Sequence, residues 1–238
     1  MLINKTELDK LFAQGNLTVS DSQYDRLEKY SRLLVEWNEK INLTAITDPE
    51  QVAKLHMLDC AALLNCADFK GKTLIDVGTG AGFPGIPLKI LVPELEIVLL
   101  DSLNKRVNWL NEVIAELGLT GIKAIHARAE EQALVKGYRD SFDFVTARAV
   151  ADLRLLGEIC LPYAKVGGTF LSMKSVGSDE ELQNAAHAIK FMGGRVRGSE
   201  DYTIPGTDVT HRVLFIDKVA PTLKGYPRRW AKIQKDPL

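Results

Sequence analysis

The feature that most limits how this chain can fold is a glycine-rich turn between a short apolar run and a helix-like segment. The run is TLIDV, residues 73–77, and the turn that follows is GTGAGFPG, residues 78–85. Glycine reaches backbone angles that a Cβ forbids, so such a turn reverses tightly and lets a ligand approach the backbone. Strand, glycine turn and helix in this order are typical of an open α/β sheet, which binds ligands at the carboxyl ends of its strands.

The chain beyond residue 72 continues this alternation. Apolar runs predict four further parallel strands, EIVLLD, IKAIHA, FDFVTA and GGTFLSM, with helical segments between them. Residues 195–202 and 211–217 can pair as two final antiparallel strands. We therefore expect a doubly wound, mostly parallel seven-stranded sheet with an antiparallel last strand and helices on both faces.

Residues 1–70 have a different pattern. Apolar residues recur at spacings of three and four through residues 20–41, which predicts an amphipathic helix, and residues 6–13 and 50–64 also have helical spacing. We expect a helical extension over residues 1–70, a ligand-binding domain over 71–220 and a basic tail over 221–238.

Composition excludes several classes of protein. A hydrophobic share of 46% and a charged share of 26% exclude general disorder. No apolar run approaches the roughly 20 residues of a membrane helix, and the N-terminus lacks the apolar core of a secretory signal, so we expect a cytoplasmic protein without a membrane partner. Three cysteines without a CxxC pair give no disulfide framework and no zinc pattern.

The charge is unevenly distributed. The whole chain has a net charge of −1, yet residues 221–238 carry five Lys or Arg against one acidic residue. This pattern is against a protein covered in nucleic-acid-binding surface and indicates either a local contact with an anion or a solvated tail.

Two ligands are candidates for the glycine turn. Gly80, Gly82 and Gly85 match the GxGxxG fingerprint of dinucleotide sites, so an NAD-dependent oxidoreductase is one alternative. Asp76, two residues before Gly78, favours the other. A carboxylate there would repel a diphosphate and suits the ammonium and sulfonium groups of S-adenosylmethionine. We therefore expect Asp76, Gly78, Gly80 and Gly82 to bind the methyl donor.

Two further acids support a ribose-bearing ligand. Asp101 ends the second strand, where a carboxylate can accept both ribose hydroxyls, although it can also be a helix cap. The backbone N–H of Ala129 and the carboxylate of Glu130 can pair with the edge of an adenine ring. Taken alone, Glu130 is more typical of a first helical turn, where the helix dipole favours an acid.

The motifs that are absent after the fourth predicted strand indicate which kind of atom accepts the methyl group. After FDFVTARA there is no Asn/Asp-Pro-Pro-aromatic motif for an exocyclic amine, and Cys160 lies on an apolar helix face that indicates core rather than a nucleophile. A ring nitrogen with a free lone pair, such as guanine N7, needs no base, only orientation. Arg148 can contact the guanine, and we assign no acid or base and no metal, because His56 and Asp59 have no third ligand.

Scattered cations indicate RNA contact. Four lie at or near the ends of predicted strands or helices, and two more lie in the tail with Tyr226 and Trp230, an interleaving of cations and aromatics that suits phosphates and stacked bases. The set is Lys105, Arg128, Lys174, Arg212, Arg228 and Arg229. For any one of them, a solvated surface is the simpler interpretation.

The sequence resembles the ribosomal RNA small subunit methyltransferase G family, also called the glucose-inhibited division protein B family. The resemblance rests on LIDVGTGAGFPGIPL, LLDSLNKRVNWL, ARAEE, VTARAV and YPRRWAKIQKDPL, with WNEKINLTAI and KLHMLDC upstream, and it covers nearly the whole chain. Cys60 stands where we expect the family to have a serine.

The resemblance implies a class I S-adenosylmethionine-dependent methyltransferase fold with a helical N-terminal extension. It implies methyl transfer to N7 of one guanosine in the decoding-region stem-loop of bacterial 16S rRNA, with naked RNA or the small ribosomal subunit as partner, no DNA, and a monomeric enzyme. The donor contacts that it implies are Gly78, Phe83, Ala129, Glu130 and Arg148. Phe83 can shield the donor or pack into the sheet as a hydrophobic staple. For Arg148, the resemblance implies a contact with the donor, whereas the chemistry of the acceptor suggests a contact with the guanine.

Overall fold

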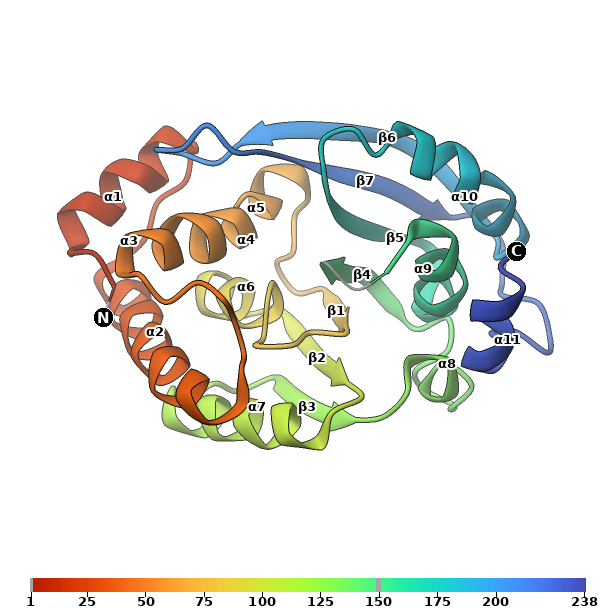
Figure 1. Cartoon of the computed structure of the whole chain (residues 1–238), viewed down its shortest axis with the longest axis horizontal. Coiled ribbons are helices and arrows are strands. Elements are labelled where there is room, and N and C mark those ends of the chain that lie inside the picture. The colour runs from red at the N-terminus through yellow and green to blue at the C-terminus, as the bar shows by residue number, and fades with distance from the viewer. Residues whose placement is uncertain (1, 149–150) are drawn as a thin grey trace.

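The structure is a computed structural model that describes residues 2–148 and 151–238. The last two residues of the VTARAV motif, Ala149 and Val150, lie outside the described residues. One seven-stranded sheet has the order β3-β2-β1-β4-β5-β7-β6 (Figure 1). Its strands are β1 (Thr73–Val77), β2 (Glu96–Asp101), β3 (Ile122–His126), β4 (Phe142–Arg148), β5 (Ala164–Ser175), β6 (Gly194–Thr203) and β7 (Thr210–Lys218). Strand β7 is antiparallel to β5 and β6 and the other pairs are parallel, which confirms the predicted fold class.

The helices occupy the N-terminal segment, the crossovers between strands and the C-terminal segment. They are α1 (Lys5–Gln14), α2 (Asp21–Ile41), α3 (Pro49–Val52), the π-helix η1 (Ala53–Leu58), α4 (Asp59–Ala61), α5 (Leu63–Cys66), α6 (Gly85–Leu91), α7 (Asn104–Glu116), α8 (Ala129–Gln132), α9 (Leu153–Cys160), the 3₁₀-helix η2 (Leu161–Tyr163), α10 (Asp179–Phe191) and α11 (Trp230–Lys235). No helix in the described part of the chain is both long and apolar enough to cross a membrane.

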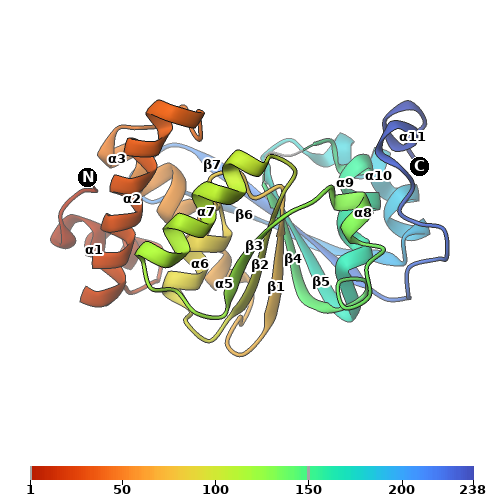
Figure 2. The ribbon, with the colours of Figure 1, turned by 90° about the horizontal axis from the view of Figure 1, so that it is seen from below.

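Helices cover both faces of the sheet because side chains alternate along each strand (Figure 2). Leu74 and Leu99 point into the core shared with α6, α7 and the N-terminal helices. Their neighbours Ile75 and Leu100 point into the opposite core, shared with α9, α10 and α11. The three layers place the carboxyl ends of the parallel strands at one edge, where the site is found.

The N-terminal helices belong to the first of these cores. Helix α2 begins with a capping box, in which Ser20 accepts from the Gln23 N–H and the Gln23 side chain accepts from the Ser20 N–H. Buried residues of α1 and α2 share one apolar cluster with Val213 and Phe215 of β7. Helix α2 packs on α6 and α7, and α1 packs on η1.

Local structure departs from the predictions in two places. The predicted helix over residues 50–64 is broken into α3, η1, α4 and α5, with a π-helical stretch at Ala53–Leu58. The tail contains a helix, α11, that we did not predict, and its Ile233 is fully buried. A segment with so few apolar residues gives little periodic signal, so its helix depends on docking against the body.

Candidate functional site

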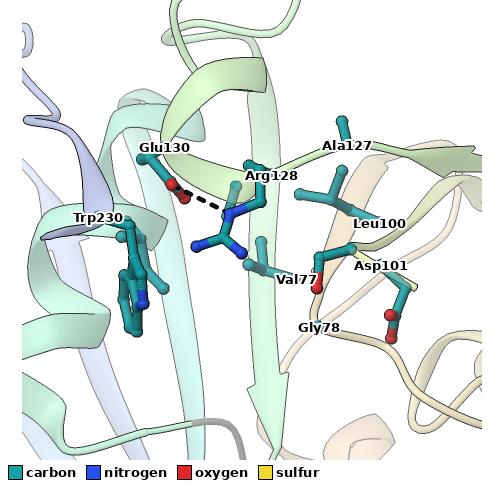
Figure 3. A pocket seen from close by; sticks show the side chains of 11 residues that line it. Val77, Gly78, Leu100, Asp101, Ala127, Arg128, Glu130 and Trp230 are labelled. Atoms are coloured by element: carbon teal, nitrogen blue, oxygen red, sulfur yellow. Dashed lines mark hydrogen bonds and ion pairs between the residues drawn. The ribbon is translucent and has the colours of Figure 1, made fainter.

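A cleft of about 210 Å³ lies at the carboxyl ends of β1, β2 and β3. Asp101 and Trp230 lie on opposite sides of it, with Arg128 and Glu130 between them (Figure 3). Its walls come from the glycine turn, the ends of three strands, α9 and the C-terminal segment: Val77, Gly78, Leu100, Asp101, Ser102, Ala127, Arg128, Ala129, Glu130, Ile159 and Trp230. This position matches the expected ligand edge of an open α/β sheet.

The glycine turn combines a ligand-facing part and a packing part. Gly78 lines the cleft with φ of +70°, and its N–H donates to the Leu100 carbonyl at 2.8 Å. Gly82 has φ of +107°, and a Cβ there would come within 2.6 Å of Ile86 Cδ1. Gly82 is therefore required for the close packing of the turn on α6, whereas the predicted donor contacts at Gly80 and Gly82 stay predictions.

Asp76 does not line the cleft. Its side chain is fully buried and points to the face of the sheet opposite to Val77, where it accepts from Thr79 Oγ1 at 2.6 Å and from the Gly85 N–H at 3.0 Å. Burial raises the pKa of Asp76 to about 7, although these hydrogen bonds act against the rise. The structure thus differs from the expectation of a carboxylate facing the ligand, because a strand turns successive side chains to opposite faces. Asp76 instead ties the turn to the start of α6.

Asp101 lies in the cleft and also supports the glycine turn. Its Oδ2 accepts from the Gly80 N–H at 2.9 Å and its Oδ1 from the Leu103 N–H at 2.8 Å. Arg106 Nη1 also lies 3.5 Å from Oδ2. An ionised carboxylate offers about four lone-pair sites, so these partners still leave an acceptor position for a ligand. The predicted ribose contact and the alternative role at the start of the next helix are therefore compatible.

Ala129 and Glu130 begin α8 beside the cleft. The Ala129 carbonyl accepts from Tyr163 Oη at 2.6 Å, which holds this turn in place. Glu130 is 6% exposed and its Oε1 accepts from Arg128 Nε at 3.2 Å. Arg128 and Glu130 thus present a cation and a carboxylate to the cleft between Asp101 and Trp230.

Phe83 and Arg148 lie together but do not line this cleft. Arg148 Cζ is 4.8 Å from the Phe83 ring centroid, and Phe83 is 5% exposed and packs against Tyr30 and His56. Arg148 Nη1 donates to Asp59 Oδ2 at 2.8 Å. Phe83 thus packs on α2 and η1 and not into the sheet as a staple, and as donor contacts both residues stay predictions.

Asp59 is the centre of a buried polar cluster that joins the N-terminal helices to β6 and β7. Its carboxylate accepts from Arg148, from Tyr202 Oη at 2.7 Å and from His211 Nδ1 at 2.7 Å. Burial acts to raise the pKa of Asp59, but the hydrogen bond from His211 and the charge of Arg148 outweigh burial and the net pKa is lowered. Among residues 2–148 and 151–238, no three His, Cys, Asp or Glu side chains are arranged to hold a metal ion.

Three of the six predicted RNA-binding cations are both ion-paired and largely buried within the protein. Lys174 pairs with Glu181 at 2.6 Å, Arg212 with Asp179 and Asp201, and Arg228 with Glu158 at 2.6 Å, and each of these cationic side chains is at most 14% exposed. A cation with a neutralised charge and little exposure attracts phosphate poorly, so the structure argues against these three as RNA contacts. Lys105 and Arg229 are exposed, and Arg128 is half-exposed at the cleft.

The structure also reveals site residues that sequence reasoning missed. Trp230, predicted only as an RNA-stacking residue of the tail, lines the cleft together with Ile159. Glu158 is fully buried and anchors the tail by accepting from the backbone N–H, Nε and Nη2 of Arg228. A lone acid in the apolar stretch LLGEICL was a usable signal, because a buried carboxylate requires a partner.

Comparison with known proteins identifies the family. The family model of rRNA small subunit methyltransferase G matches residues 23–202. The ribosomal RNA small subunit methyltransferase G of Clostridium perfringens is 47% identical over 220 residues, which are 92% of each chain. The chain belongs to this family. The enzyme of the same name from Lachnoclostridium phytofermentans is also 47% identical, over 99% of this chain and 97% of its own.

Solved structures agree on the fold of this family member. A crystal structure of a variant of MtNAS in complex with S-adenosylmethionine superposes with a TM-score of 0.56 at 15% identity, covering 82% of this chain and 73% of that one. The chain therefore has the class I methyltransferase fold that we predicted. The NAD-dependent alternative is excluded by the family. Asp76 does not meet the ligand directly as we expected, because its carboxylate is buried outside the cleft.

Proposed function

We propose that this chain transfers the methyl group of S-adenosylmethionine to N7 of a specific guanosine in the decoding-region stem-loop of bacterial 16S rRNA. The observation that carries the proposal is a cleft lined by Gly78, Asp101, Ala129 and Glu130 in a chain 47% identical to a ribosomal RNA small subunit methyltransferase G. We propose further that it acts as a monomer in the cytoplasm, on naked RNA or on the small subunit.

The residues around the cleft fit a nucleoside. Asp101 has an unused acceptor position for a ribose hydroxyl, and the N–H of Ala129 with the carboxylate of Glu130 offers a donor and an acceptor for an adenine edge. Gly78 brings the backbone close to the ligand because it carries no side chain. S-adenosylmethionine, when bound, supplies a methyl group made electrophilic by the positively charged sulfur.

The reaction itself requires orientation rather than proton transfer. The N7 lone pair forms the new bond to carbon while the sulfur–carbon bond breaks and its electron pair returns to sulfur. The products are S-adenosylhomocysteine and a 7-methylguanosine whose ring carries the positive charge. No proton moves, so the protein contributes by holding the base in line with the methyl group.

A labelled-donor assay tests the proposal. Wild-type protein is incubated with methyl-labelled S-adenosylmethionine and either small subunits or 16S rRNA from cells that lack this protein, and the labelled nucleotide is mapped by cleavage at 7-methylguanosine. We expect one labelled guanosine. Absence of label, or label on another atom or base, would refute the proposal.

A matched pair of variants links the activity to the cleft. Glu130→Ala removes an acceptor from the cleft, whereas Glu131→Ala changes the exposed neighbouring acid of α8. We expect the first variant to raise the donor concentration needed for half-maximal activity about tenfold and the second to leave it unchanged. Equal behaviour of the two would place the donor elsewhere.

A further inference from the structure

The C-terminal segment does not extend into solvent but is fixed to the body beside the cleft. Arg228 is bound to the fully buried carboxylate of Glu158 through three hydrogen bonds of 2.6 to 2.9 Å. Arg139 donates to the backbone carbonyls of Thr222, Leu223 and Tyr226 at 2.6 to 2.9 Å. These bonds constrain the residues just before α11 and therefore the place of Trp230, the first residue of that helix.

Two apolar contacts complete this docking. The Tyr226 ring lies 4.9 Å from the Phe191 ring at an interplanar angle of 66°, and Ile233 is fully buried in the core formed with α9 and α10. The segment is thus anchored on both sides of Trp230. An aromatic ring held in this way loses little freedom when a ligand packs against it.

Trp230 provides an aromatic wall on the Glu130 side of the cleft. Arg128 Cζ is 5.9 Å from its ring centroid, and Arg128 in turn donates to Glu130 (Figure 3). Asp101, the expected ribose contact, lies on the other side. A nucleoside whose ribose meets Asp101 therefore extends its base toward Ala129, Glu130 and Trp230.

We propose that Trp230 is a binding residue of the donor site, and that the adenine ring of S-adenosylmethionine packs against its indole. The inference deepens the proposed function and rests on it. The tail is then a structural part of the donor site, and its aromatic residue contacts the donor and not an RNA base. Packing of a base on an aromatic side chain is favourable for any purine, while Ala129 and Glu130 supply the edge contacts that select adenine.

Three variants test this assignment by calorimetry. Trp230→Ala should weaken binding of S-adenosylmethionine about tenfold, as expected for the loss of one base–aromatic contact. Trp230→Phe keeps an aromatic face and should stay within about twofold of wild type. Lys235→Ala changes an exposed residue of the same helix and should leave donor affinity unchanged.

A fragment of the donor tests whether Trp230 contacts its adenosine part or its amino-acid part. 5′-Methylthioadenosine keeps the adenosine and lacks the amino acid, so its affinity should fall by the same factor as that of the whole donor in Trp230→Ala. Donor-dependent quenching of tryptophan fluorescence should be present in wild type and absent in Trp230→Phe, because Trp37 and Trp109 are outside the cleft.

Each contrary result has a separate meaning. Wild-type protein that does not bind S-adenosylmethionine removes the proposed function and this inference together. Wild-type protein that binds it, with Trp230→Ala binding equally well, removes the inference alone, as does a loss of 16S rRNA affinity with donor affinity intact. Faster tryptic cleavage at Lys232 and Lys235 in Trp230→Ala, with donor affinity not restored by Trp230→Phe, would assign Trp230 a packing role and overturn the proposal.

Discussion

At the scale of single residues, Asp101 connects the shape of the glycine turn to ligand binding. It accepts from the Gly80 and Leu103 N–H groups while lining the cleft. Asp101→Ala should weaken binding of S-adenosylmethionine by about 1–3 kcal/mol, because hydrogen bonds to a charged acceptor are lost. Calorimetry measures the change, and Asp101→Asn, which keeps one acceptor oxygen, should lose less. An unchanged affinity in Asp101→Ala would contradict the ribose assignment.

His56 gives a second residue-scale prediction, on stability against pH. Burial, and then the charge of Arg148, lower the pKa of His56 from its ordinary 6.5 to about 4. The unfolded chain therefore binds a proton below pH 6.5 that the folded protein takes up only near pH 4. The stability due to the neutral ring is fully present above pH 6.5 and is lost as the pH falls toward 4.

The size of this effect is measurable by urea unfolding. Between pH 7.5 and 5 the shift in pKa corresponds to a loss of about 2 kcal/mol in the free energy of unfolding. His56→Gln removes the titrating group, so the difference in stability between variant and wild type should move by that amount in favour of the variant at pH 5. Comparing the two proteins cancels the titration of other groups, and a difference that is independent of pH would contradict the assignment.

The sequence predicts the role of a site residue well when the role depends only on lying at the end of a strand. It predicts the role poorly when the role also depends on which face of the sheet the side chain points to. Asp101 was placed correctly at the end of a strand, and Ala129 and Glu130 come to the same cleft. Asp76 was assigned to the donor because it lies two residues before Gly78. That assignment did not consider that successive side chains of a strand point to opposite faces, so that Asp76 points away from the face of Val77. The partner of Arg228 lies 70 positions away, and no local pattern identifies it.

At the scale of elements, helix α2 stabilises the glycine turn through a hydrogen bond to its backbone. Tyr30 Oη donates to the Ala81 carbonyl at 2.8 Å, and Trp109 Nε1 of α7 donates to the same oxygen at 3.2 Å. Tyr30→Phe should lower the free energy of unfolding by about 1 kcal/mol and weaken donor binding, because the Ala81 carbonyl of the turn loses one of its two side-chain donors.

The same helix provides the control for this prediction. Tyr24 Oη donates to the Ile3 carbonyl at 3.0 Å, far from the turn in sequence. Tyr24→Phe should therefore lower stability comparably and leave donor affinity unchanged. If both variants, measured by urea unfolding and calorimetry, affect the donor equally, α2 acts only through overall stability.

Elements with strong local patterns were predictable from the sequence. The runs that give β1 and β2 match the predicted strands residue for residue, because short runs rich in apolar residues decide the local structure. Helix α11 was not predicted, since Trp230 and Ile233 are stabilised by α9 and α10, which lie far away in the sequence. The π-helical turn of η1 has no sequence pattern that we can name.

At the scale of the whole molecule, the N-terminal and C-terminal segments support the two sides of the site. The helices of residues 5–66 contact the back of the glycine turn and the Arg148–Asp59 pair, and the tail forms one wall of the cleft. The six cations predicted to contact RNA also fall into two groups, those in internal ion pairs and those at exposed positions. RNA binding should therefore depend on the exposed members of the set, with the internal ones affecting it only through stability.

Arg228 and Arg229 test this division because they are adjacent and differ in environment. Arg228→Ala leaves the buried Glu158 carboxylate without its partner, so the free energy of unfolding should fall by about 3–5 kcal/mol. Arg229 is exposed, so Arg229→Ala should leave stability unchanged, weaken binding to 16S rRNA and reduce the slope of log affinity against log salt by about 1. Urea unfolding and RNA titrations at several salt concentrations measure both effects. A stable Arg228→Ala protein with a reduced salt slope would contradict this division, because Arg228 would then contact phosphate and contribute little to stability.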